Sequence, residues 1–111
     1  MTLEVRVEAE ASADLVSAIE YYLREAGSEV ALRFVETVEA AFNLVARHPA
    51  AGHRFEGAMN LRLRSLRVWP MKDYPYSIYY EADARAVRIY SVVHSGRDVE
   101  DVLGSRFAGR G

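Results

Sequence analysis

Two helical segments that follow each other almost without a break constrain the fold of this chain more than any other feature. Apolar residues recur at helical spacing over residues 12–26, with Ser12 in the position of an N-cap, and again from Ser28 until Pro49 stops the second helix. Only the step from Gly27 to Ser28 separates the two apolar stripes. A connection this short allows only antiparallel packing, so the sequence predicts a helical hairpin.

Strands are expected on both sides of this hairpin. Apolar and charged residues alternate over residues 3–9, and the same alternation begins again at Leu61. Two later runs are rich in β-branched and aromatic residues, which favour strands. The elements expected after the hairpin are a loop at 49–60, strands at Leu61–Arg67, Tyr76–Glu81 and Val87–His94 separated by a Trp69–Asp73 connection and an Asp83–Ala86 turn, a short helix at about 98–103, and a flexible tail at 104–111.

The order of these elements indicates the fold class. An N-terminal strand, the helical hairpin, three sequential strands and a short C-terminal helix (β-α-α-β-β-β-α) predict an α+β domain whose hairpin packs on one face of a mainly antiparallel sheet. A length of 111 residues suits one such domain, so residues 1–111 are expected to form a single domain. Phe34 and Phe42 lie on the apolar stripe of the second helix and are expected to be buried in the core.

Residue composition argues against several functional classes. The sequence has no cysteine and only three scattered histidines (His48, His53 and His94), so neither a metal site nor a thiolate nucleophile is expected. Glycine-rich phosphate loops and the other common cofactor signatures are absent from the sequence, and no cofactor is expected. No stretch approaches the roughly 18 consecutive apolar residues of a membrane span, and no signal peptide is recognisable, so we expect a cytoplasmic protein without membrane contact.

Charge is distributed unevenly along the chain. Residues 1–51 carry 4 basic and 9 acidic side chains, for a net charge of −5, whereas residues 52–111 carry 10 basic and 7 acidic side chains, for a net charge of +3. Of the 14 basic residues, all but Lys72 are arginine, whose planar donor groups suit phosphate and carboxylate. The basic half therefore either faces an anionic partner or balances the acidic half.

Arginines in the first strand after the loop are one candidate for a binding surface. Arg62 and Arg64 lie two apart on the expected strand, so their side chains share a face about 7 Å apart, near the spacing of phosphates along a nucleic-acid strand. Arg67 extends this set. The alternative is a solvated sheet face without a binding role.

Aromatic residues in the same half of the chain are a second candidate. Such residues can stack on bases when a sheet is open, but in strands they more often form the core or cross-strand pairs. The aromatic residues concerned are Trp69, Tyr74, Tyr76, Tyr79, Tyr80 and Tyr90.

The turn that follows the last strand is the third candidate. His94-Ser95-Gly96-Arg97-Asp98 ends a strand and opens a helix, with Asp98 in the position of a cap. A helix N-terminus beside a guanidinium suits a phosphate or carboxylate, so His94 and Arg97 are candidates for a binding role. The alternative is a structural turn in which Arg97 pairs with Asp98, Glu100 or Asp101.

Several segments, taken in order, resemble a known family over nearly the whole chain. They are Ala13-Asp14-Leu15 and Ile19-Glu20-Tyr21-Tyr22 in the first helix, Ala31-Leu32-Arg33-Phe34 in the second, His48-Pro49 and Gly52 at the loop, Leu61-Arg62, Tyr76-Ser77-Ile78-Tyr79-Tyr80, and Val93-His94-Ser95-Gly96-Arg97-Asp98. In this order and spacing they resemble the RelE/ParE superfamily of bacterial toxin–antitoxin toxins, also called plasmid stabilisation proteins. The resemblance implies the RelE/ParE-like fold.

The superfamily divides by target. RelE-like members cut mRNA on the ribosome, whereas ParE-like members share the fold and inhibit DNA gyrase without a recognised nuclease site. Cleavage through the 2′-hydroxyl needs a base, a proton donor and cations around the phosphate. In this sequence Val102 and Leu103 stand where the nuclease branch tends to place a tyrosine, so the ParE-like branch is favoured.

The resemblance thus implies a ParE-like toxin of a type II toxin–antitoxin system. It is expected to inhibit DNA gyrase by protein–protein contact and to form a hetero-oligomer with a ParD-like antitoxin whose flexible C-terminal segment wraps it. The residues expected to bind the target are Arg62, Arg64, Arg67, Trp69, His94 and Arg97. This binding surface exists only if the arginines of the later strands gather on the sheet face that the hairpin leaves uncovered.

Two alternatives stay open. One is a RelE-like mRNA endonuclease, in which His94 would act with Arg64, Arg67 and Arg97, because imidazole titrates near neutral pH. The other is a non-toxic binding module that keeps the fold and an antitoxin partner.

Overall fold

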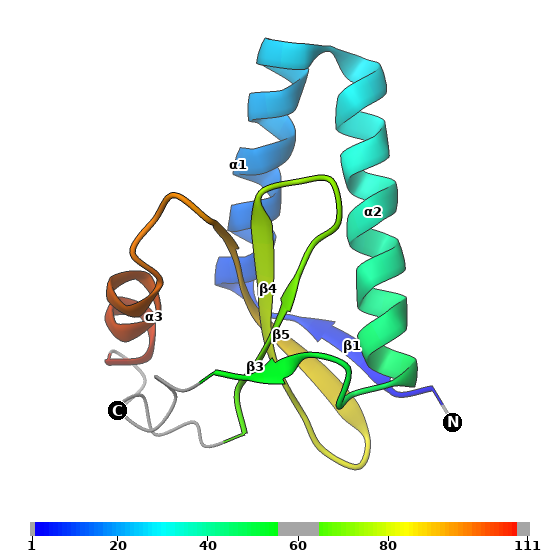
Figure 1. Cartoon of the computed structure of the whole chain (residues 1–111), viewed down its shortest axis with the longest axis vertical. Coiled ribbons are helices and arrows are strands. Elements are labelled where there is room, and N and C mark those ends of the chain that lie inside the picture. Colours follow the sequence, from blue (N-terminus) through cyan, green and yellow to red (C-terminus); the bar gives the residue numbers. More distant parts are fainter. Residues whose placement is uncertain (1, 56–64, 109–111) are drawn as a thin grey trace.

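The expected architecture is present in the computed structural model, which describes residues 2–55 and 65–108 (Figure 1). A helical hairpin packs against a five-stranded sheet, and a shorter helix lies on the other side of that sheet. The elements are β1 (Glu4–Val7), α1 (Ala9–Ala26), α2 (Ser28–Arg47), β2 (His53–Arg54), β3 (Arg67–Pro70), β4 (Tyr76–Ala82), β5 (Ala86–His94) and α3 (Val99–Ala108). The predicted α+β class is confirmed.

The sheet has the strand order β1-β5-β4-β3-β2. β1 runs parallel to β5, and the other three pairs are antiparallel, as a mainly antiparallel sheet requires. The register between β4 and β5 shifts at Tyr79 and Tyr80, whose partners are Ser91 and Ile89. An additional residue in one strand of a pair re-aims the side chains beyond it. At one end of this pair, Tyr76, the first residue of β4, pairs with His94, the last residue of β5.

The larger core lies between the hairpin and the sheet. Phe34 from α2 is fully buried among residues of β4 and β5 such as Ile78 and Ile89. Phe34 therefore lies in the core as expected, whereas Phe42 is only partly buried.

Gly27 joins the two helices with φ of 93°, a left-handed backbone conformation that glycine adopts without strain.

A second, smaller core lies on the opposite face of the sheet. Leu103 of α3 is fully buried there against Leu66, Val68 and Val93. Figure 1 shows α3 beside the sheet on the side away from α2. The hairpin leaves this face free, as expected, but α3 covers part of it, because β3, β4 and β5 carry apolar side chains on both faces.

Helix boundaries differ from the prediction at both ends of the chain. α1 begins at Ala9, and the backbone N–H of Ser12 already donates to the carbonyl of Glu8, so Ser12 lies within the first turn and is not the cap. The position before the helix is Glu8, which makes no side-chain capping hydrogen bond. α3 continues through residues 104–108, which were expected to be a flexible tail. Burial of Leu103 in the smaller core explains why helical structure extends past that residue.

Strand boundaries also differ from the prediction. Residues 53–54, expected to be loop, form a two-residue strand that pairs with β3, too short to leave a periodic signal. β3 runs through Trp69 and Pro70, which were expected to be a connection, because they pair with Ile78 and Ser77 of β4. Most of the strand expected at Leu61–Arg67 lies outside the described residues.

Candidate functional site

Arg67 lies on the face of the sheet that carries the hairpin. Its partner in β4 is Tyr80, whose side chain belongs to the larger core, and directly opposed residues of an antiparallel pair point to the same face. Val68, the next residue, belongs to the smaller core on the other face. The expectation that Arg67 projects from the uncovered face was therefore wrong, and Arg62 and Arg64 lie outside the described residues.

The guanidinium of Arg67 fastens the loop that follows α2. Its Nη1 donates to the carbonyl of Gly52 at 2.6 Å, while the Gly52 N–H donates to the hydroxyl of Tyr80 at 2.9 Å. That hydroxyl donates in turn to the carbonyl of Pro49 at 2.7 Å, and burial raises the pKa of Tyr80, which keeps the donor proton in place at neutral pH. A Cβ at position 52 would lie 2.6 Å from the Tyr80 hydroxyl, so only glycine fits there. Arg67 thus has a structural role in this loop.

Trp69 lies apart from the other candidate residues. It is partly buried and packs against the larger core, and it lines an open groove of about 750 Å³ between α2 and the β3–β4 connection. Other residues of this groove include Arg33 and Glu36 of α2 and Lys72 and Asp73 of the connection. His94 lines a different groove, so the structure does not bring Trp69 and His94 into one site.

The turn after β5 is built by local hydrogen bonds, as the sequence indicates. The Gly96 N–H donates to Nδ1 of His94 at 2.9 Å, and the Arg97 N–H donates to the His94 carbonyl at 3.0 Å. Asp98 accepts from the Asp101 N–H at 3.2 Å, which confirms the expected cap at the start of α3. The ring of His94 stands edge-on to Tyr76, with ring centroids 5.1 Å apart. These contacts fix where His94 and Arg97 leave the sheet.

Bonding at the imidazole of His94 determines its tautomer. Because Nδ1 accepts a backbone N–H, a neutral His94 must carry its proton on Nε2. The free nitrogen of the exposed ring is therefore a hydrogen-bond donor. This arrangement suits contact with an anionic or carbonyl group, and it does not supply a general base at Nε2.

Arg97 is exposed and available for binding. Among the residues that the structure describes, its guanidinium forms no ion pair with Asp98 or Asp101, the two described carboxylates proposed as its structural partners. A surface arginine without a carboxylate partner keeps its bidentate donor geometry for an incoming carboxylate or phosphate. The structure therefore shows neither of these two pairings.

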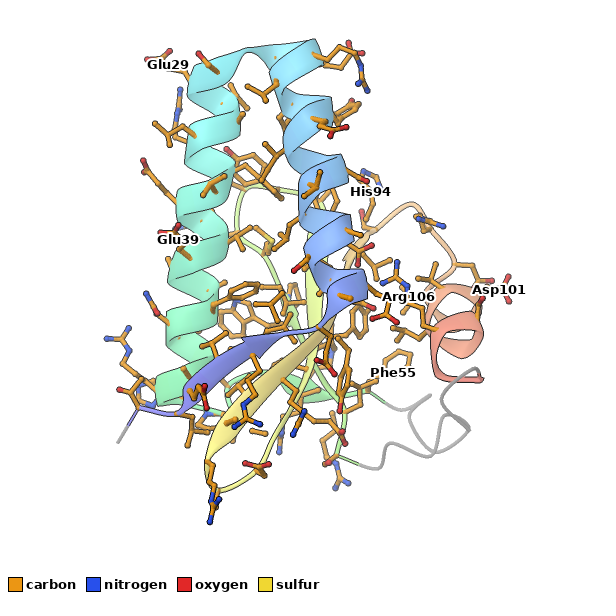
Figure 2. All side chains as sticks on the ribbon, turned by 180° about the vertical axis from the view of Figure 1, so that it is seen from behind. Glu29, Glu39, Phe55, His94, Asp101 and Arg106 are labelled. Carbon is orange, nitrogen blue, oxygen red and sulfur yellow. The ribbon has the colours of Figure 1, made fainter. Side chains whose placement is uncertain are left out.

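His94 and Arg97 contribute to one groove between α1, the end of β5 and α3. Its volume is about 370 Å³, within the range of small binding pockets. Figure 2 shows His94 and Arg106 on the side of α1 that faces α3. The apolar lining comes from Ala18, Val92, Val93 and Val102, and the polar or aromatic lining comes from Asp14, Ser17, Tyr21, Tyr76, His94, Arg97 and Arg106.

A partly buried ion pair lines this groove. Nη2 and Nη1 of Arg106 lie 2.7 and 2.8 Å from the two carboxylate oxygens of Asp14, and Nη1 also donates to the Ser91 hydroxyl at 2.6 Å. Asp14 in addition accepts from the Val92 N–H at 2.9 Å. The hydrogen bonds that Arg106 donates to Asp14 raise the pKa of its guanidinium further above the usual value. This cluster joins α1, β5 and α3, and we call it the α3 clamp (Asp14, Ser91, Val92 and Arg106).

Sequence reasoning missed the α3 clamp. Asp14 entered only as part of the Ala13-Asp14-Leu15 segment of the first helix, and Arg106 was placed in the expected tail. The two residues are 92 positions apart, and no local pattern connects them. Their position in the groove has an electrostatic consequence. Arg106 neutralises Asp14, and among the described residues that line the groove Arg97 has no carboxylate partner.

Clusters of metal ligands and membrane-spanning helices are both absent from the described residues. In residues 2–55 and 65–108, no three His, Asp or Glu side chains gather closely enough to hold a metal ion. Over the same residues, no helix combines the length and the apolar character that a bilayer span requires.

This fold defines a class of small α+β proteins, which have a helical hairpin on one face of a five-stranded sheet and a short helix on the other face. One solved structure of this class, described as the chromosomal ParDE TA system from P. aeruginosa, matches with a TM-score of 0.69. At 18% sequence identity, the match covers 84% of this chain and 96% of that chain. It establishes a shared fold.

Sequence comparison defines the family. The sequence pattern described as "ParE toxin of type II toxin-antitoxin system, parDE" matches residues 5–99, which include both long helices, strands β2 to β5 and all of β1 except Glu4. This chain therefore belongs to the ParE toxin family of type II toxin–antitoxin systems. Among curated proteins no significant match is found.

Proposed function

We propose that this chain inhibits DNA gyrase in the cytoplasm by protein–protein contact. The observation that carries the proposal is membership of the ParE family over residues 5–99, since ParE-like toxins are the gyrase-directed branch of the superfamily that the sequence resembles. Within this proposal, His94 and Arg97 contact the target. They are exposed, lie in one groove, and offer donors to an acidic surface.

Side-chain geometry favours contact over RNA cleavage. The cutting of RNA needs a base to accept the 2′-hydroxyl proton, and the free nitrogen of neutral His94 is a donor. Cleavage also needs cations around the phosphate, and Arg67, one of the arginines considered for this role, donates to the Gly52 carbonyl on the other face of the sheet from Leu103 and α3. His94 and Arg67 therefore do not form the constellation that the nuclease alternative requires.

A cognate antitoxin is the proposed binding partner of the free toxin. The structural neighbour comes from a ParDE toxin–antitoxin system, and antitoxin segments that fold on binding can cover long stretches of surface. The groove with Arg97 suits an acidic side chain of such a segment. We therefore propose a toxin–antitoxin hetero-oligomer in which the antitoxin covers His94 and Arg97 and so blocks the target-binding groove.

A supercoiling assay with purified gyrase tests the proposed target. With the chain in excess over gyrase, we expect conversion of relaxed plasmid to supercoiled plasmid to fall at least about tenfold, because a bound toxin must occupy a working surface of the enzyme. Pre-mixing with the cognate antitoxin is expected to restore supercoiling. Supercoiling at the full rate in the presence of excess folded toxin rules out the proposal.

The two alternatives give different results in cells. A ribosome-dependent nuclease produces new 5′ ends on translated messages by primer extension, without any effect on purified gyrase. A non-toxic binding module produces neither effect, and its expression without the antitoxin leaves growth unchanged. A gyrase inhibitor arrests growth without cleaving messages.

A further inference from the structure

The solvent side of the helical hairpin carries exposed apolar side chains that the proposed function does not use. Val16 and Leu23 on α1 are 54% and 50% exposed, and Leu32 on α2 is 60% exposed. The chain exposes few other large apolar residues in its described part, the remaining two being Val7 and Tyr21. Where such side chains lie together on a surface, they usually mark a contact site.

Helical geometry places all three side chains on the outward side of the hairpin. At about 100° per residue, Val16 and Leu23 lie about 140–160° round the helix from the buried Ala18, and Leu32 lies about 160° round from the buried Phe34. Leu23 precedes Gly27 by four residues and Leu32 follows it by five, so the two stand at the same level of the antiparallel pair.

One flank of each helix lines a groove described above. Asp14, Ser17 and Tyr21 point from α1 toward the groove beside α3, and Val30 and Thr37 point from α2 toward the groove beside Trp69. Val16, Leu23 and Leu32 therefore border the outer seam between the two helices. We call these three residues the seam patch.

Carboxylates surround the seam patch. Glu20 lies between Val16 and Leu23 on α1, and Glu36 and Glu39 follow Leu32 by about one and two turns of α2. Glu36 stands at the outer edge of the helix and also lines the groove beside Trp69. All three are exposed, and none of them forms an ion pair within the part of the chain that the structure describes. In Figure 2, Glu29 and Glu39 lie on the opposite side of the molecule from His94 and Arg106. The hairpin thus presents the seam patch with carboxylates beside it, on another flank of the molecule from the groove that His94 lines.

We propose that the seam patch is a second docking surface, which binds an amphipathic helix with basic flanks from a protein partner. A helix that lies along the seam places an apolar stripe on Val16, Leu23 and Leu32, and its basic flanks then meet Glu20, Glu36 and Glu39. A second copy of this chain is a poor occupant, because it would bring carboxylates against carboxylates. An acidic peptide segment is repelled for the same reason and is directed to the groove with Arg97.

This surface does not depend on the proposed gyrase contact. By helical spacing, Val16 and Leu23 lie on a different flank of α1 from Asp14, Ser17 and Tyr21, so a basic helix and an acidic segment can be bound at the same time. A failure of either proposal therefore leaves the other to be judged on its own experiment.

Designed peptides test the seam patch directly. The probe is a fluorescently labelled helical peptide of about 18 residues, the length of α1, with leucine at heptad spacing and lysine or arginine on both flanks. A second peptide has the same leucines and glutamate flanks. By fluorescence anisotropy on the whole chain, we expect the basic peptide to bind at least about tenfold more tightly than the acidic one.

Surface variants locate the binding. Leu23→Gln with Leu32→Gln is expected to weaken the basic peptide at least about tenfold, whereas Val7→Gln, an exposed apolar residue outside the seam patch, is expected to change affinity less than about twofold. Circular dichroism confirms that each variant is folded. If a leucine variant does not fold, Glu39→Lys with Glu36→Lys replaces it and is expected to shift the preference toward the acidic peptide.

Three results overturn the proposal. They are the absence of binding by the basic peptide, equal binding of the two peptides, and binding that is the same for the wild-type chain and the seam variants. Each of them means that the seam patch and the carboxylates beside it do not act together as a docking surface.

Discussion

Replacement of Phe34 by alanine lowers the free energy of unfolding by about 3–5 kcal/mol. Phe34 is fully buried, and its ring centroid lies 5.1 Å from those of Tyr22 and Tyr74 and 5.5 Å from that of Tyr76. These rings come from α1, from the β3–β4 connection and from β4, so the truncation opens a cavity where three elements meet. Denaturant unfolding followed by circular dichroism measures the loss.

Leu32 supplies a matched control for Phe34. It lies on the same helix but is 60% exposed, so Leu32→Ala is expected to change the free energy of unfolding by less than about 0.5 kcal/mol. If Phe34→Ala costs no more than Leu32→Ala, the larger core is not organised around Phe34 as described.

Replacement of Asp14 by alanine is expected to lower the free energy of unfolding by about 3 kcal/mol. The side chains of Asp14 and Arg106 are only 14% and 22% exposed, and the variant leaves a partly buried guanidinium and the Val92 N–H without their acceptor. The same denaturant titration measures the effect. Arg6→Ala is the matched control, since Arg6 and its partner Glu4 are 46% and 64% exposed and the expected cost is below about 1 kcal/mol.

A double-mutant cycle separates the α3 clamp from other effects of Asp14. Asp14→Ala combined with Arg106→Ala is expected to cost less than the sum of the two single variants, because removal of both partners leaves no unpaired charge. Strict additivity of the two costs contradicts the description of the clamp as one coupled unit.

The hairpin and the strands β4 and β5 could be predicted because their signals are local. The apolar stripes of residues 12–26 and 28–47 have helical spacing, and the Gly27 link fixes their antiparallel packing. The boundary at Ala9 was missed because no side chain caps α1, so no capping residue marks its start.

The face of the sheet occupied by Arg67 could not be predicted, because alternation along a strand tells which residues share a face but not which face carries the hairpin. Both faces of β3 carry apolar side chains, Val68 on one and Trp69 on the other, so polarity gave no guide. The hydrogen bonds of Arg67 and Tyr80 to the 49–52 loop arise only after the sheet and the hairpin have packed.

Of the candidate groove, the part formed by local structure could be predicted and the part formed by long-range contacts could not. The turn from His94 to Asp98 is a local structure, and its hydrogen bonds match the expected turn and cap. The α3 clamp joins residues 92 positions apart, so the ion pair that positions α3 along the groove has no local signature. Tertiary packing alone brings Asp14 to Arg106.

The most direct test of the central claim is inhibition of gyrase by the Arg97→Ala variant. Arg97 is exposed and outside the α3 clamp, so this variant is expected to unfold at the same denaturant concentration as the wild-type chain while its inhibition of supercoiling falls at least about tenfold. Arg85→Ala removes an exposed arginine from the β4–β5 turn and is expected to inhibit gyrase as the wild-type chain does. Full inhibition by folded Arg97→Ala contradicts the account, because the groove beside α3 is then not the surface that meets the target.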